Sequence, residues 1–250
     1  MSSALDPARA LFLIKGADRI DFLQGLVSND VSRIAEGPVY AALLTPQGKY
    51  LADFFLIADG DGVILDVAEP LAAGLVQRLS MYKLRADVAI TPMESGVTRG
   101  LGEGPAGAVS DPRHPEMGWR CYDGSAPEQP VDWPALRVRL AIPESGVELQ
   151  PNESYILEMD FERLNGVNFR KGCFVGQEIV ARMHHKTVLK KGLRRVQIDG
   201  VADIGTEITV GDKPAGAVFT QAGGEALAYL RFDRIGPDMK AADATLAPAD

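Results

Sequence analysis

Three apolar, strand-like runs near the start of the chain are separated only by short polar turns. The runs are 39–44, 51–58 and 63–67, and their connections contain TPQGK and DGDG. Runs of this length, bounded by Gly, Pro and Asp, are typical of strands joined by turns. The pattern therefore predicts an antiparallel sheet, which restricts the fold more than any other feature of the sequence.

Helical segments flank this sheet in the sequence. A strand-like ALFLI is followed by apolar residues at helical spacing from Gly16 to Val27. Beyond the three runs, Pro70 begins an apolar-periodic segment that ends near Tyr82, and ADVAI follows as a strand. The order β-α-β-β-β-α-β predicts an α+β domain over residues 1–92, with helices covering one face of the sheet.

The remainder of the chain predicts two further units. Residues 93–189 contain Gly- and Pro-rich stretches between short runs and the helix-like WPALRVRLAI, which indicates a second α+β domain. Residues 190–250 contain short alternating runs separated by Gly and Asp, which indicate a small all-β domain. The Ala-, Asp- and Pro-rich tail after Pro237 is expected to be frayed.

Composition and charge exclude several classes of protein. The net charge of −8 is opposite to what coating a nucleic-acid backbone requires, so no direct nucleic-acid partner is expected. The apolar runs are far shorter than the roughly 20 residues of a membrane-spanning helix. The N-terminal residues also lack the basic and apolar regions of a secretion signal, so the expected location is the cytoplasm.

The two cysteines, Cys121 and Cys173, are 52 positions apart and belong to no CxxC or Cys/His cluster. This spacing argues against a disulfide scaffold and against a self-contained zinc site, so no metal ligands are assigned. Cys121 lies in an expected strand and is interpreted as structural. Cys173 is the candidate for chemistry.

Cys173 lies in RKGCFVGQE, just before a segment with helical spacing. The leading end of a helix and the neighbouring cations Arg170 and Lys171 all favour the thiolate form. Gly172 and Gly176 allow a close backbone approach to a ligand. The alternative is that Cys173 is a small buried apolar residue, which is the commoner environment of a free cysteine.

KGCFVGQEIVARM resembles the KGC[FY]xGQE signature of the YgfZ-type folate-binding proteins. These are relatives of the glycine-cleavage T protein, an aminomethyltransferase, and members act in iron–sulfur cluster assembly or repair. IKGADRIDFLQGLVSNDV, LLTPQGKYLADF and YKLRADVAI continue the resemblance in order. It implies the T-protein fold, in which ferredoxin-like α+β domains surround a central folate-binding hole and a small β-barrel follows.

The resemblance also implies site residues. Trp133 corresponds to a tryptophan that contacts folate, and a flat indole suits stacking on a pterin; its alternative role is an anchor at a helix start. Arg9 stands where the relatives have a second tryptophan. Asp53 corresponds to an acidic folate contact, or is a solvated strand-end carboxylate. The implied cofactor is tetrahydrofolate or a one-carbon derivative, and Gln177 and Glu178 would anchor the loop or cap the helix.

Two departures from the T-protein pattern concern catalysis. Ala52 replaces one acidic residue of that family, and Arg139 stands where a glutamate lies near the pterin. Because aminomethyl transfer needs carboxylates at the reacting nitrogen, the pattern argues against that reaction. The resulting hypothesis is a folate-binding accessory factor that uses Cys173 to support iron–sulfur assembly proteins or client enzymes, including tRNA-modifying ones. The alternatives are a folate-dependent aminomethyl or methyl transferase and a non-catalytic folate-binding scaffold.

Overall fold

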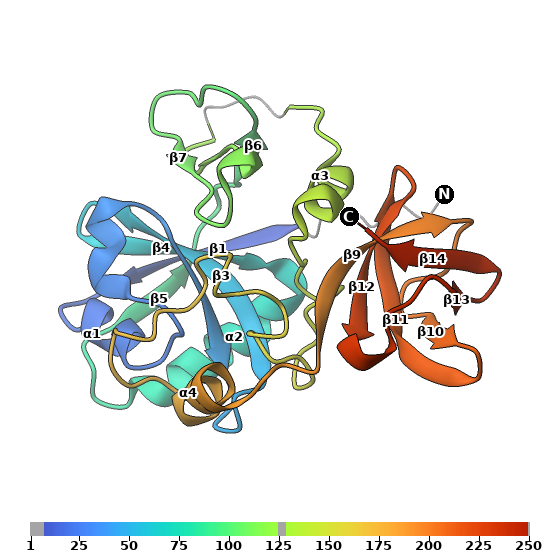
Figure 1. Cartoon of the computed structure of the whole chain (residues 1–250). Coiled ribbons are helices and arrows are strands. Elements are labelled where there is room, and N and C mark those ends of the chain that lie inside the picture. The colour runs from blue at the N-terminus through green and yellow to red at the C-terminus, as the bar shows by residue number, and fades with distance from the viewer. Residues whose placement is uncertain (1–7, 125–128, 250) are drawn as a thin grey trace.

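The computed structural model describes residues 8–124 and 129–249 (Figure 1). Its N-terminal part is a five-stranded sheet in the order β2-β3-β4-β1-β5, and all four pairings between neighbouring strands are antiparallel. The strands are β1 (Arg9–Lys15), β2 (Val39–Leu44), β3 (Tyr50–Asp59), β4 (Gly62–Ala68) and β5 (Ala89–Pro92). The predicted sheet is confirmed, including the two turns that join β2, β3 and β4.

Two α-helices and a 3-10 helix pack against one face of this sheet. They are α1 (Arg19–Gln24), η1 (Val31–Glu36) and α2 (Glu69–Lys83), and α2 has Pro70 in its first turn, as predicted. Leu23 of α1 and Leu79 of α2 are fully buried in a core that also contains Phe54 of β3. Packing on this face of the sheet removes the apolar sides of the helices from water, and this burial stabilises the α+β architecture.

The opposite face of the sheet is also buried, because the following segment folds across it. Tyr40 of β2 and Phe55 of β3 share a core with Leu136 and Phe161 from this later segment. Consistent with two covered faces, every residue of β2 and β4 is buried. The first and second predicted domains therefore share a hydrophobic core.

The middle of the chain contains little regular structure. A small sheet in the order β6-β8-β7 is followed by single helices and a long stretch of turns over residues 141–176. The elements are β6 (Thr98–Gly100), β7 (Val109–Ser110), η2 (Pro115–Met117), β8 (Trp119–Cys121), α3 (Trp133–Leu140) and α4 (Gln177–Lys186). The stretch of turns lies against the first unit, since Tyr50 donates its backbone N–H to Ser154 and accepts that of Asn152.

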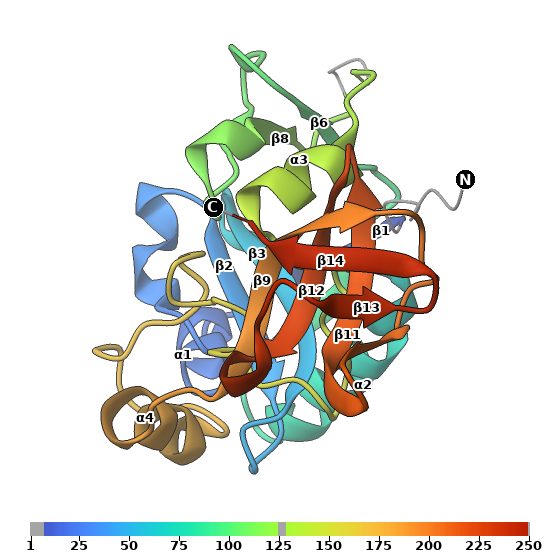
Figure 2. The same ribbon diagram turned by 45° about the vertical axis from the view of Figure 1, so that its right-hand side comes forward.

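The C-terminal part is a closed barrel with the strand order β10-β11-β12-β9-β14-β13, in which β10 also pairs with β13 (Figure 2). Its elements are β9 (Lys191–Asp199), β10 (Glu207–Val210), β11 (Lys213–Ala222), β12 (Glu225–Arg231), η3 (Phe232–Arg234), β13 (Met239–Ala241) and β14 (Ala244–Pro248). The prediction of a frayed tail is wrong. Residues after Pro237 form the two strands that close the barrel, where the small side chains of Ala241 and Ala244 fill its interior.

Candidate functional site

The two cysteines lie in opposite environments. Cys121 is fully buried in β8, and its Sγ lies 3.0 Å from Oδ1 of Asp123. Cys173 is exposed on the loop that leads into α4. The burial of Cys121 agrees with its interpretation as structural, and the alternative that Cys173 is a small buried apolar residue is wrong. An exposed thiol is open to both chemical reaction and metal ligation.

Lys171 fastens the loop that carries Cys173 to the end of α1. Its ammonium donates hydrogen bonds to the carbonyls of Gln24, at 2.5 Å, and Val27, at 2.6 Å. A cation here satisfies carbonyls that a helix end leaves without partners. Burial lowers the pKa of Lys171 to about 8, although the charges of Asp30 and Cys173 act in the opposite direction. Lys171 therefore has two roles, as an anchor of the loop and as a positive charge near the thiol.

Further contacts join the segment before the thiol to the same region of the first unit. Asn168 donates its backbone N–H to the carbonyl of Ser28 at 3.0 Å. The Ser28 hydroxyl, which is fully buried, donates to the carbonyl of Gly166 at 2.6 Å. These contacts join segments more than 130 residues apart in the sequence. The loop that carries Cys173 (the thiol loop) is therefore held by the first unit as well as by α4.

The two glycines of the motif have different surroundings. Both have positive φ, +97° at Gly172 and +83° at Gly176. A Cβ at Gly176 would lie 2.6 Å from the carbonyl oxygen of Thr45 and 3.0 Å from Cα of Gly48, whereas one at Gly172 would meet nothing within 4 Å. The close approach at Gly176 is therefore to the β2–β3 turn of the same chain. Open space lies at Gly172, beside the thiol.

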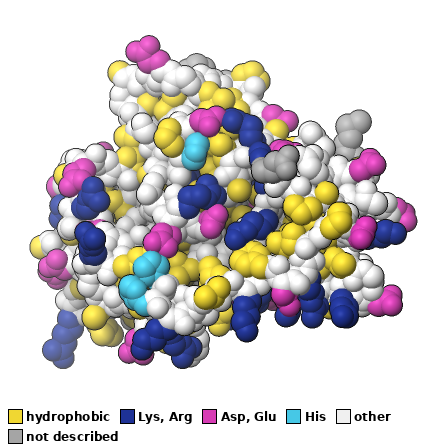
Figure 3. All heavy atoms as spheres, in the orientation of Figure 1, with side chains coloured by type: hydrophobic (Ala, Val, Ile, Leu, Met, Phe, Trp, Pro, Cys, Tyr) yellow, Lys and Arg dark blue, Asp and Glu magenta, His cyan; other side chains and the backbone are white. Residues whose placement is uncertain are grey.

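The other predicted motif residues lie on the surface around this loop. Arg170 is exposed, and its backbone N–H is held by the Asn168 side chain at 2.8 Å. Gln177 is the first residue of α4, after Gly176 as N-cap, and the exposed Glu178 lies in its first turn, where a carboxylate is favourable. On this face basic and acidic side chains are interspersed (Figure 3).

His184, near the other end of α4, makes contacts within the chain. Its ring is stacked on Phe169 with 3.9 Å between centroids, and its Nε2 lies 3.1 Å from a carboxylate oxygen of Glu162. Among the described residues, no group of three His, Cys, Asp or Glu side chains is arranged to hold a metal ion. None of the helices described is long and apolar enough to cross a membrane.

Asp53, predicted as a folate contact, is almost completely buried with an exposed fraction of 2%. Its carboxylate accepts hydrogen bonds from the hydroxyls of Tyr40 at 3.0 Å, Tyr50 at 2.6 Å and Ser145 at 2.6 Å. Burial, and then the charge of Asp53, raise the pKa of both tyrosines well above the ordinary value. The alternative of a solvated strand-end carboxylate is wrong, and sequence reasoning missed the three hydroxyl partners.

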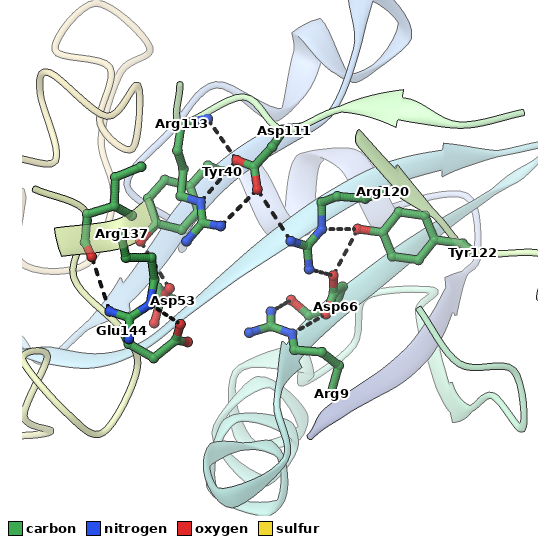
Figure 4. Close-up of polar contacts among 11 residues, drawn as sticks. Arg9, Tyr40, Asp53, Asp66, Asp111, Arg113, Arg120, Tyr122, Arg137 and Glu144 are labelled. Carbon is green, nitrogen blue, oxygen red and sulfur yellow. Dashed lines mark hydrogen bonds and ion pairs between the residues drawn. The ribbon is translucent and has the colours of Figure 1, made fainter. Parts of the chain in front are cut away.

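Arg9 belongs to a buried layer of charged side chains between the sheet and the second unit (Figure 4). Asp66 of β4 accepts hydrogen bonds from Arg9 Nε at 2.6 Å, Arg120 at 2.6 Å and the Tyr122 hydroxyl at 2.8 Å. Burial alone raises the pKa of Asp66, but Arg9 and Arg120 outweigh it and hold that pKa at about 2. The carboxylate is therefore charged at every physiological pH.

A second aspartate continues this charged layer. Arg113 donates two hydrogen bonds to the carboxylate of Asp111, at 3.0 Å and 2.8 Å, and Arg120 lies 3.3 Å from the same carboxylate. Burial alone raises the pKa of Asp111, but the charge and hydrogen bonds of Arg113, together with the charge of Arg120, outweigh it and lower this pKa. Arg120 thus bridges Asp66 and Asp111, and the layer alternates in charge.

Trp133 is the first residue of α3 and is 8% exposed. The guanidinium of Arg99 lies over its ring, 4.4 Å from the centroid. In this arrangement Arg99 covers one face of the indole, and little of the rest of the side chain is exposed. Asp53 and Arg9 are engaged by the partners described above. The residues that the resemblance assigns to folate therefore do not fit a bound pterin, and no chemical step is derived through one.

Comparison with known proteins places the chain in a family. It is 30% identical over 265 residues to the iron–sulfur cluster assembly factor IBA57, mitochondrial, of Mus musculus, covering 89% of this chain and 72% of that protein. The chain belongs to the IBA57 family. The human protein of that name is 29% identical over 274 residues, with 91% and 76% of the two chains covered. A homologue from Mycosarcoma maydis is 31% identical over 218 residues, which are 74% of this chain and 54% of the fungal protein.

Two further similarities concern the fold. Residues 190–250 match the CAF17 C-terminal beta-barrel domain, in agreement with the closed barrel. The crystal structure of the glycine cleavage system aminomethyltransferase T from Bartonella henselae superimposes with a TM-score of 0.73 at 11% identity, covering 96% of this chain and 83% of the other. The predicted T-protein-like α+β fold with a C-terminal barrel is confirmed. At this identity the likeness extends to the fold alone.

Proposed function

We propose that this IBA57-family protein supports the assembly or repair of iron–sulfur clusters, with the Cys173 thiolate as a transient ligand of the cluster. The proposal is supported first by the printed function of the relatives, which are named as iron–sulfur cluster assembly factors. It is supported next by the exposure of Cys173, because the thiolate is the form of cysteine that binds metal.

The number of cysteines shapes this proposal. Iron–sulfur clusters are usually held by four thiolates. The sequence contains two cysteines, and one of them, Cys121 in β8, is buried. The remaining ligands must therefore come from a partner, either an assembly protein or a client enzyme. Cys173 contributes one thiolate to a cluster shared across that contact.

The surrounding residues assist the thiolate in different ways. Lys171 and the exposed Arg170 supply positive charge beside a ligand that must lose its proton before it binds iron. Lys171 also holds the loop against α1, so the thiol is presented without a large ordering cost on binding. Gly172 leaves the adjacent space open for the partner's cluster.

Two narrower parts of the sequence-based hypothesis stay predictions. These are the cytoplasmic location and clients among tRNA-modifying enzymes. The relatives are named as mitochondrial proteins. The prediction that tetrahydrofolate is bound is weakened, because Asp53 and Arg9 are engaged by partners within the chain. An aminomethyl or methyl transferase is disfavoured further by Ala52, which supplies no carboxylate.

The proposal is tested by complementation in a strain of the source organism that lacks this gene. Wild-type protein and the Cys121→Ser variant are expected to restore the activity of [4Fe–4S] enzymes in extracts, whereas Cys173→Ser is expected not to. Immunoblots and melting temperatures check that each variant accumulates and folds. Full rescue by folded Cys173→Ser would refute the role of the thiol.

A further inference from the structure

We infer that the space in which a T-protein fold would hold folate is filled by this chain's own side chains, so that the protein works without binding a reduced folate. Three independent observations carry this inference. Recognition of a pterin requires a carboxylate and an aromatic face, and recognition of the glutamate tail requires cations.

The carboxylate of Asp53 is committed to the chain. A pterin presents a guanidine-like edge of N–H donors, and a carboxylate that holds this edge must offer it both oxygens. Here Oδ1 accepts from Tyr50 and Ser145, and Oδ2 accepts from Tyr40. A pterin would displace hydroxyls that are themselves buried, and an unpaired buried hydroxyl is unfavourable.

The aromatic face of Trp133 is stacked within the protein. The Arg99 guanidinium lies 4.4 Å from the ring centroid and is itself largely buried, as is the indole. A guanidinium over an indole is a favourable cation–π arrangement that occupies one face of the ring, and with 8% of Trp133 exposed little of the other face is open to a second ring. Burial, followed by the charges of Arg120 and Arg113, lowers the pKa of Arg99.

Three other arginines of the buried layer already have anionic partners. Arg9 is paired with Asp66, Arg113 with Asp111, and Arg120 with both aspartates. Each of these arginines has at most 11% of its side chain exposed. A glutamate tail would therefore compete with carboxylates that are already fixed, charged and desolvated, rather than meet a free cation.

The inference is tested by anaerobic titration of the wild-type protein with tetrahydrofolate and with 5-formyltetrahydrofolate. Calorimetry is expected to show no saturable heat, and the melting temperature should stay within about 1 °C at a ligand concentration of about 1 mM. A glycine-cleavage T protein serves as the positive control under the same conditions. Saturable binding with a dissociation constant below about 100 μM, accompanied by a rise in melting temperature, would overturn the inference.

A variant in the cell provides the second measurement. Trp133→Phe retains an apolar ring in the core at a smaller contact area, and it is expected to rescue the deletion strain as well as wild type does. Loss of rescue by a Trp133→Phe protein that melts normally would contradict a purely structural role for the indole. This outcome is distinct from failure of the proposed function, which would appear as rescue of the deletion strain by Cys173→Ser.

Discussion

Replacing Asp66 with asparagine removes the charge at the centre of the buried layer while keeping the shape of the side chain. The carboxylate is 0% exposed and accepts hydrogen bonds from Arg9, Arg120 and Tyr122. Without its charge, Arg120 retains only Asp111 as an anionic partner in the layer, at 3.3 Å. A buried guanidinium that has lost its closer partner destabilises the folded state.

The size of the effect follows from the pKa of Asp66 and from its partners. A carboxyl pKa held at about 2, against an ordinary value of 3.8, corresponds to roughly 2.5 kcal/mol of stabilisation at neutral pH. Breaking a buried ion pair on one side typically costs about 3–5 kcal/mol, because the other charge is left behind. For a chain of this length, that loss lowers the melting temperature by roughly 6–20 °C.

The assay is thermal and urea unfolding followed by circular dichroism at pH 7. Asp61→Asn is the matched control, because Asp61 also pairs with a cation, Lys15 at 3.1 Å, but its side chain is 82% exposed. An exposed pair contributes little, so this control is expected to melt within about 1 °C of wild type. If Asp66→Asn melts together with Asp61→Asn, the electrostatic reasoning about the buried layer is refuted.

The pH dependence of stability in wild type and in Asp66→Asn tests whether the pKa of Asp66 is lowered in the folded state. Because the pKa of Asp66 is lowered in the folded state, its stabilising contribution is complete above the ordinary carboxyl pKa and is lost as pH falls toward about 2. The difference in unfolding free energy between wild type and Asp66→Asn should therefore narrow between about pH 4 and pH 2. If the difference in unfolding free energy instead widens as the pH falls, the lowered pKa of Asp66 is contradicted.

Further predictions concern the thiol loop. Iodoacetamide should modify Cys173 in the native protein and reach Cys121 only on unfolding, as peptide mass spectrometry would show. Gly176→Ala should lower the melting temperature by several degrees more than Gly172→Ala, since only its Cβ would strike the neighbouring turn; equal shifts would contradict this. Lys171→Met should slow alkylation of Cys173 a few-fold at pH 7 and increase amide exchange in the loop. Unchanged exchange would exclude the anchoring role.

Much of the fold could be predicted from local patterns. The strands of the first sheet and the first four strands of the barrel, together with α2 and α3, are encoded by turn residues and apolar periodicity within short windows. The last two strands were missed because Ala, Asp and Pro have low strand propensity, and β14 is stabilised by pairing with β9 about 50 residues earlier. That pairing is a tertiary effect that no local pattern contains.

The site divides in the same way. The position of Cys173 before a helix could be predicted from its neighbours in the sequence, because both are local. The partners of Asp53 and Arg9 could not, since Ser145 is 92 positions and Asp66 57 positions away. The role of Lys171 was predicted only in part, because its bonds to the carbonyls of Gln24 and Val27 span more than 140 positions.

The central claim, that Cys173 ligates a cluster supplied by a partner, is tested most directly by measuring alkylation of this thiol with and without a [2Fe–2S] complex of glutathione. Under anaerobic conditions we expect the complex to protect Cys173 from alkylation in wild type, and we expect Cys173→Ser not to bind the cluster, so that it lacks the cluster's visible absorbance. Alkylation of Cys173 at an unchanged rate, together with equal cluster uptake by Cys173→Ser, would contradict it.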